Sequence, residues 1–218
     1  MEPPFPDPKT LSVDKKYPYC GDSQLSQSLL VSGEGNLQNA VVILESMNPS
    51  SKDNPGEKAV LHQKECHFEP HISILAPNAS LQITNEDPLA HDVRLFDGAS
   101  MLSRDDMDVS ANPVSHPFSK EGVYTIRCGL HHWMHAFVIV TAQPHALTDS
   151  EGKFSLSGVP AGQYRLHLWH ETLGEIFLDL EVKESISDFH YTFSSMSFPR
   201  KRESKLDPRL EHAGMTVS

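Results

Sequence analysis

Apolar and polar residues alternate along much of this chain, with the period of two that is typical of half-buried β-strands. The alternation is clear over residues 72–83, where a turn at Pro77–Asn78 divides it, and again over residues 175–182. The region after Pro144 has no helical period of useful length. The pattern therefore predicts an all-β protein made of short strands separated by turns.

Two of the predicted strands carry residues that commonly bind metals. One strand ends at Cys128, and a turn-rich patch leads into another strand that begins at His91. The sequence Cys128-Gly-Leu-His131-His-Trp-Met134 places a thiol, an imidazole and a thioether within seven residues. One thiolate, two imidazoles and a weak axial thioether form the ligand set of a blue-copper electron-transfer site. The candidate ligands of one mononuclear copper site are therefore His91, Cys128, His131 and Met134.

Other interpretations of these residues remain open. Zinc prefers four strong nitrogen, sulfur or oxygen ligands and has no use for a methionine, and Cys128 by itself can be a buried structural thiol. Either His132 or His135 could replace Met134 in an altered copper geometry. His71 is either a surface residue or a neighbour of the site, as an extra ligand or a hydrogen-bond partner of one. His132 directly follows a candidate ligand, and we expect it to point to solvent.

Size and charge limit the classes of function. The chain has 218 residues, which is enough for two small domains. Its net charge of -11 argues against a nucleic acid as partner, because phosphate binding needs a basic face. No stretch approaches the length of a membrane-spanning helix. The sequence therefore favours a metal-binding β-protein with neither a nucleic-acid partner nor a membrane span.

Four short motifs occur in order before the candidate metal loop, which begins at Cys128: Phe-x-Pro at Phe68, Asn-x-Asp at Asn85, His91, and Gly-x-Tyr at Gly122. This order resembles the cupredoxin family, the small Greek-key sandwiches that include plastocyanin. The loop Cys-x-x-His-x-x-Met resembles the short ligand loop of amicyanin. The resemblance implies that two histidines, His91 and His131, supply the imidazoles, that Cys128 supplies the thiolate, and that Met134 is the axial ligand.

The sequence changes character after Pro144. Residues 149–156 follow the pattern Asp-x-x-Gly-x-Phe-x-Leu and residues 159–166 the pattern Val-Pro-x-Gly-x-Tyr-x-Leu. Together they resemble a carboxypeptidase regulatory-like module, which has a transthyretin-like fold. The usual first strand of such a module resembles residues 37–44, far upstream. Two arrangements stay open: the copper domain is inserted within this second sandwich, or residues 37–45 are the first strand of the cupredoxin.

Residues 17–183 as a whole are similar to a bacterial group described as methylamine-utilisation or plastocyanin-like proteins. The expected fold class is thus all-β, a cupredoxin Greek-key sandwich plus a second, smaller transthyretin-like β-sandwich. The expected organisation is an extended N-terminal segment (1–36), a strand of either sandwich (37–45), the copper domain (60–142), the regulatory-like sandwich (143–195) and a disordered tail (196–218).

The two remaining cysteines, Cys20 and Cys66, are either a disulfide, if the protein is exported, or two unrelated reduced thiols. The resemblance implies a periplasmic or otherwise exported protein. Residues 1–8 have neither the basic start nor the apolar run of a secretory signal. Either the leader precedes this sequence or the protein is cytosolic. Because copper-thiolate redox proteins normally work outside the reducing cytosol, we expect the true start to lie further upstream.

We expect a small electron carrier that is not an enzyme and that exchanges electrons with a redox partner protein. Electrons are expected to pass through an exposed edge of His131, framed by His132 and Trp133. The alternative is a non-redox module for copper binding or delivery, or for recognition of a protein or glycan.

Overall fold

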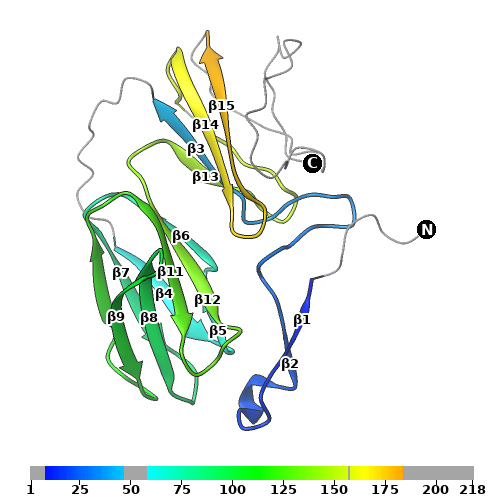
Figure 1. The fold of residues 1–218 in the computed structure, drawn as a ribbon, viewed down its shortest axis with the longest axis vertical. Helices are drawn as coiled ribbons and strands as arrows, with labels where there is room; N and C mark the ends of the chain where they lie inside the picture. Colours follow the sequence, from blue (N-terminus) through cyan, green and yellow to red (C-terminus); the bar gives the residue numbers. More distant parts are fainter. Residues whose placement is uncertain (1–7, 47–57, 157, 184–218) are drawn as a thin grey trace. The chain divides into compact units, whose positions relative to one another are not determined.

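The structure is a computed structural model that describes residues 8–46, 58–156 and 158–183 (Figure 1). Within these ranges the regular structure consists of β-strands and one 3₁₀ turn, Pro18–Cys20. The all-β prediction is therefore confirmed. No helix in the described part of the chain is long and apolar enough to cross a membrane. The tail expected to be disordered, 196–218, lies outside the described residues.

The chain divides into two compact units. The unit with the candidate ligands, here called the ligand unit, includes the described residues 10–26 and 58–142. The second unit is formed by residues 8–9, 27–46 and 143–183, apart from residue 157. The sequence of the second unit is thus interrupted by the ligand unit.

The ligand unit contains a five-stranded sheet. Its strands, in spatial order, are β6 (Ile72–Leu75), β12 (His135–Val140), β11 (Gly122–Cys128), β8 (His91–Asp97) and β9 (Ser100–Met107). Strands β11 and β8 are antiparallel, with Cys128 opposite Val93. Because of this register, the end of β11 and the beginning of β8 lie at the same edge of the sheet.

A four-stranded sheet completes the ligand unit. Its order is β10 (Val114–Phe118), β7 (Ala79–Asn85), β4 (Lys58–Lys64) and β5 (His67–Glu69). Leu81 and Ile83 of β7 are fully buried, as their alternation predicts, and they belong to the same core as Val93 and Ile126 of the other sheet. Full burial of such a side chain stabilises a fold by roughly 1.5–3 kcal/mol, so this shared core holds the two sheets together.

The two-residue turn between β4 and β5 has an unusual backbone. Both of its residues, Glu65 and Cys66, have positive φ, at 53° and 61°. A hairpin of this length favours such angles, but Asn-Gly is the usual sequence because other residues are strained there. The Asp87 carboxylate accepts hydrogen bonds from both backbone N–H groups, at 2.6 Å and 2.9 Å. These bonds offset the strain of the turn.

A disulfide attaches the N-terminal part of the ligand unit to this turn. Cys20 and Cys66 are bonded and buried, which confirms the disulfide over two reduced thiols. Short strands β1 (Thr10–Ser12) and β2 (Ser23–Leu25) pair on either side of Cys20. The structure differs here from the extended segment expected for residues 1–36, because a pair of strands and a covalent bond order residues 10–25.

The second unit has one sheet among its described residues. The strand order is β13 (His145–Leu147), β3 (Val41–Ser46), β14 (Gly162–His170) and β15 (Gly174–Val182). Strand β3 pairs with β13 and β14, so residues 41–46 belong to this sheet and not to the ligand unit. The described part contains no second sheet facing it, and Phe154 and Leu156 pack on its core from a segment that is not a strand.

Replacing Glu65 by glycine is expected to stabilise the ligand unit. The Glu65 side chain is exposed, so its loss removes few contacts, while glycine adopts positive φ without steric cost. The free energy of unfolding should rise by about 1 kcal/mol. Chemical denaturation with a check for unchanged secondary structure measures it.

Lys64→Gly, one residue earlier in β4, is the control. Lys64 is also exposed but does not have positive φ, and glycine inside a strand should lower the stability by roughly 0.5–1 kcal/mol. A loss of stability in both variants would contradict the strain assigned to the turn.

Candidate metal site

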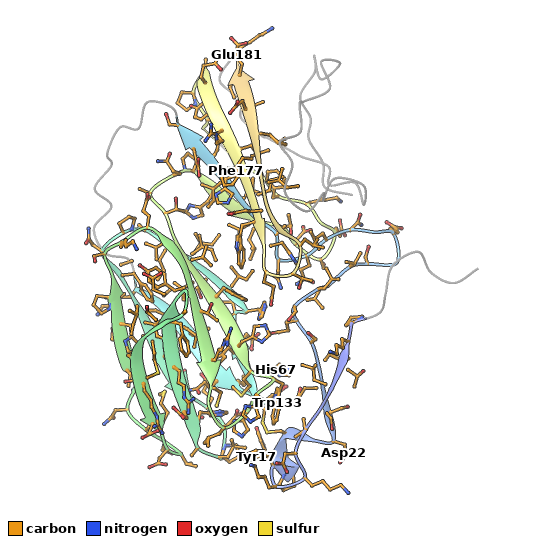
Figure 2. The ribbon with its side chains drawn as sticks, in the orientation of Figure 1. Tyr17, Asp22, His67, Trp133, Phe177 and Glu181 are labelled. Carbon is orange, nitrogen blue, oxygen red and sulfur yellow. A yellow bond between two sulfur atoms is a disulfide. The ribbon has the colours of Figure 1, made fainter. Side chains whose placement is uncertain are left out.

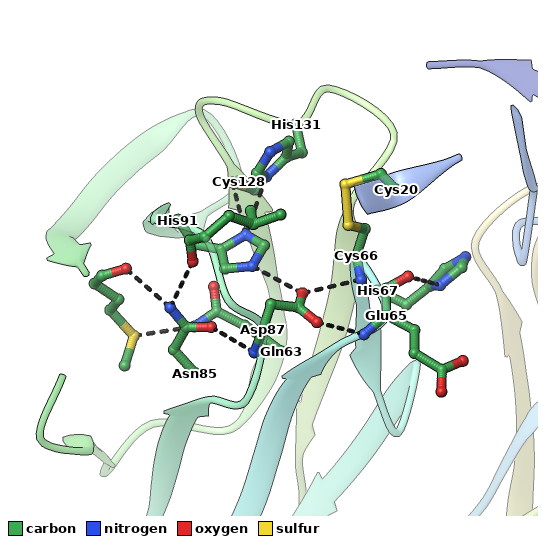
Figure 3. A network of polar contacts seen from close by, with 12 residues as sticks. Cys20, Gln63, Glu65, Cys66, His67, Asn85, Asp87, His91, Cys128 and His131 are labelled. Carbon is green, nitrogen blue, oxygen red and sulfur yellow. Dashed lines mark hydrogen bonds and ion pairs between the residues drawn. A yellow bond between two sulfur atoms is a disulfide. The ribbon is translucent and has the colours of Figure 1, made fainter. Parts of the chain in front are cut away.

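Three of the predicted ligands converge at one edge of the five-stranded sheet. His91 is the first residue of β8, Cys128 is the last residue of β11, and His131 lies in the loop between β11 and β12. The loop is closed by backbone hydrogen bonds from Cys128 to the carbonyl of Met134 and from Met134 to the carbonyl of His131, at 3.1 Å and 2.9 Å. Figure 3 shows the three side chains directed toward one another.

The ligand atoms form a small triangle. The Cys128 Sγ lies 3.7 Å from Nδ1 of His91 and 3.5 Å from Nδ1 of His131, and the two Nδ1 atoms are 3.0 Å apart. All three residues are buried, with exposures of 1% for His91, 3% for Cys128 and 0% for His131. These three atoms are close enough together that they could hold one metal ion between them.

The donor set of this triangle suits a soft, trigonally bound metal. Two imidazoles and one thiolate are the strong ligands of a blue-copper site. A structural zinc site would need a fourth strong ligand, and the cluster around Cys128 contains no further histidine, cysteine or carboxylate within the described ranges. Met134 is buried, and it ends the same loop, three residues after His131. The residues present therefore fit copper better than zinc.

Asp87 orients one of the imidazoles. Its Oδ2 lies 3.0 Å from Nε2 of His91, so the other ring nitrogen, Nδ1, is directed to the triangle (Figure 3). Burial raises the pKa of Asp87, but the hydrogen bond and the charge of His91, together with the backbone N–H groups of Cys66 and Glu65, lower it overall. Burial lowers the pKa of His91, and the bonds to Asp87 and Cys128 raise it overall. A carboxylate behind a metal-binding histidine fixes the ring and its tautomer.

The environment of Cys128 favours its thiolate. Burial raises the pKa of this thiol, but hydrogen bonds from His131 and His91 and from the backbone of Asp92 lower it to about 6. The thiolate is the form that binds a metal. The protein therefore holds the deprotonated ligand in place before any metal binds.

The loop packs closely on the ion pair of Asp92 and Arg94. Gly129 donates its N–H to the carbonyl of Asp92 at 2.7 Å. The Asp92 carboxylate is buried and bonded to Arg94 and Arg104. A Cβ at position 129 would lie 2.3 Å from both the Asp92 Oδ2 and the Arg94 side chain. Only glycine fits at this position without displacing the ion pair.

Two other histidines lie together, outside the triangle. The rings of His71 and His135 have centroids 5.1 Å apart, and His135 Nδ1 also lies 3.3 Å from the carbonyl of Trp133. Neither joins the cluster of His91, Cys128 and His131. The structure therefore does not bring these candidate extra ligands to the three converging atoms.

The prediction that an edge of the His131 ring is exposed is wrong. His131 is fully buried, and the ring of Tyr17 lies edge-on against it with a centroid distance of 4.3 Å. The ring of Trp133 is also close to that of His131, with a centroid distance of 5.2 Å. His132 is exposed, as expected. Sequence reasoning missed Tyr17 because it is more than a hundred positions from His131, and the only signal was its nearness to Cys20, whose bond to Cys66 brings it there.

Comparison with known structures gives partial similarities. A purple cupredoxin from Nitrosopumilus maritimus is 20% identical, with 38% of this chain and 99% of that chain covered and a TM-score of 0.35. Amicyanin from Paracoccus versutus is 18% identical, with 46% and 97% covered and a TM-score of 0.36. A Cu-containing nitrite reductase from Thermus scotoductus is 17% identical, with 44% and 25% covered and a TM-score of 0.36.

No family model and no curated protein matches the chain. Each structural similarity above covers less than half of it. The functional argument therefore depends on the ligand geometry.

The metal-free protein should carry a Cys128 thiolate at neutral pH. The pKa is lowered from 9.0 to about 6, so the thiolate ultraviolet absorption should appear as the pH rises through about 6. Because folding lowers this pKa, the thiolate adds to stability above pH 9 and this contribution is lost as the pH falls through about 6. A pH titration of absorbance measures the midpoint, with Cys128→Ser as the blank. A midpoint near 9 would contradict the stabilised thiolate.

Proposed function

We propose that the chain is a mononuclear, type-1-like copper protein that transfers electrons. The convergence of His91 Nδ1, His131 Nδ1 and Cys128 Sγ within 3.0–3.7 Å of one another is the observation that supports this most strongly. Met134 is proposed as the weak axial ligand, because it is buried at the end of the same short loop. The proposed role is a carrier and not an enzyme, because the sequence lacks the second His-x-His cluster typical of multicopper oxidases.

The residues around the site keep the ligands in fixed positions. When bound, copper supplies a one-electron couple between its singly and doubly charged forms. His91 is held by Asp87, and the metal loop is held by its own backbone bonds and by Gly129 against Asp92. Such fixed ligands move little when the charge of a bound ion changes. This favours rapid electron transfer over ligand exchange.

Copper delivery is less well supported. A protein that hands its metal to a partner needs ligands that the partner can reach. The three strong candidate ligands are almost completely buried, and the Tyr17 ring covers one of them. Burial therefore favours a resident ion over a transferred one.

An exported location is part of the proposal. The Cys20–Cys66 disulfide supports it, because structural disulfides persist mainly in oxidising compartments. A copper-thiolate redox site would work in the same environment. The proposed partner is a redox protein of that compartment.

Copper(II) should give the protein a strong visible colour that depends on Cys128. The colour comes from charge transfer between a thiolate and copper, so Cys128→Ser should remove it. His132→Ala is the matched control, because His132 is exposed and adjacent to a ligand, and this variant should keep the colour. Absorption spectra of copper-loaded proteins test this. A colourless wild-type copper complex whose Cys128 still reacts with thiol reagents would contradict the proposal.

Met134→Leu should keep copper and colour but change the reduction potential. An axial thioether binds weakly and adjusts the potential more than it holds the ion. Leucine has a similar volume, so the buried loop should retain its packing. Redox titration followed by absorbance gives the potential. If this variant failed to bind copper although it was folded, Met134 would have to be a strong ligand.

A further inference from the structure

The segment that precedes the disulfide forms a strap on the ligand unit. The strap, residues 13–22, is closed by a bond from the N–H of Val13 to the carbonyl of Asp22, at 3.2 Å. Its turn is held by a bond from the N–H of Cys20 to the carbonyl of Tyr17, at 3.0 Å. Val13 and Cys20 are buried in the core of the ligand unit. The strap is therefore fixed at its beginning by packing and near its end by the disulfide.

Tyr17 extends from the strap onto a candidate metal ligand. Its ring is 4.3 Å from the ring of His131 and 6.2 Å from that of Trp133, between centroids. Figure 2 shows Tyr17 and Trp133 at the same end of the ligand unit. The Nε2 atom of His131 is buried and has no hydrogen-bond partner among the described residues. The rings of Tyr17 and Trp133 thus both contact His131, whose Nδ1 belongs to the metal triangle and whose Nε2 is buried.

Cys66 connects the strap to both imidazoles. Its sulfur binds Cys20, its N–H donates to the Asp87 carboxylate at 2.9 Å, and its carbonyl accepts the indole N–H of Trp133 at 3.0 Å. Asp87 in turn binds His91, and Trp133 contacts His131. The residue that anchors the strap therefore also positions the neighbours of both histidines.

We infer that the strap is an aromatic cover that controls access to the metal site, with Tyr17 as its positioning residue. The cover separates His131 from solvent and from small redox reagents. Electron exchange then proceeds through the Tyr17–Trp133 surface, so a partner must contact these rings. The route of electrons through these rings rests on the proposed electron-transfer function. The shielding of His131 does not, because it is a property of the chain itself.

The shielding can be tested on the metal-free protein. Diethyl pyrocarbonate modifies accessible imidazoles, and mass spectrometry of peptides gives the rate at each histidine. Wild-type His131 should react far more slowly than His132, which is exposed and serves as the internal reference. Tyr17→Ala should accelerate the modification of His131 about tenfold, the order of an aromatic contact, and leave the rate at His132 unchanged.

Three further variants distinguish the effect of losing the Tyr17 ring from the effect of a general loss of structure. Tyr17→Phe keeps the ring and should keep His131 protected. Leu25→Ala removes an exposed side chain from β2, next to the strap, and should also have no effect. The double variant Cys20→Ser, Cys66→Ser, with its fold checked by circular dichroism, should expose His131 as Tyr17→Ala does. Wild-type His131 reacting as fast as His132, or Tyr17→Ala remaining as protected as wild type, would overturn the inference.

Electron exchange is the second measurement. Hexaammineruthenium(II) gives one electron to the copper(II) protein, so that ruthenium becomes trivalent and copper singly charged. Stopped-flow bleaching of the colour should be about tenfold faster in Tyr17→Ala than in wild type or Tyr17→Phe, with unchanged absorption spectra. Equal rates would reject control of electron exchange by the strap, whatever the protection of His131. A wild-type protein that forms no coloured copper complex would reject the proposed function alone, because protection of His131 is measured without metal.

Discussion

The Asp87 carboxylate is the point at which the hairpin turn, the disulfide and the candidate metal site meet. One oxygen accepts the N–H of Glu65, and the other accepts the N–H of Cys66 and contacts His91 Nε2. A buried carboxylate is costly unless it is fully bonded, and here its bonds also offset the strain of two residues with positive φ. Local strain, the orientation of an imidazole and the anchor of the strap therefore depend on one side chain.

The candidate metal site also depends on the register of the five-stranded sheet. Pairing of β8 with β11 brings His91 and Cys128 to one edge, and the short loop to β12 returns His131 to the same place. The shared core beneath these strands leaves the ligands nearly inaccessible to water. Hydrogen bonds are stronger in such a setting, which strengthens the contacts among Cys128 and the two imidazoles.

Much of the fold and of the site could be predicted from local patterns. Alternation located strands such as β7 and β15, and the residue types around Cys128 indicated the metal triangle. Other features depend on contacts between distant residues, for which a local pattern is not sufficient. The pairing of β3 with β14 joins residues on opposite sides of the ligand unit in sequence, so the strand pattern of residues 37–44 left two arrangements open. The burial of His131 results from Tyr17, which reaches it only because Cys20 is bonded to Cys66. Phe154 and Leu156 show a limit of such patterns, because a loop that packs on a core can bury every second residue without forming a strand.

X-ray absorption spectroscopy at the copper edge of the copper-loaded, full-length chain tests the central claim most directly. The account predicts one copper ion with one short sulfur ligand and two imidazole nitrogens, from Cys128, His91 and His131. A first coordination shell made only of nitrogen and oxygen, without the short sulfur, would contradict it.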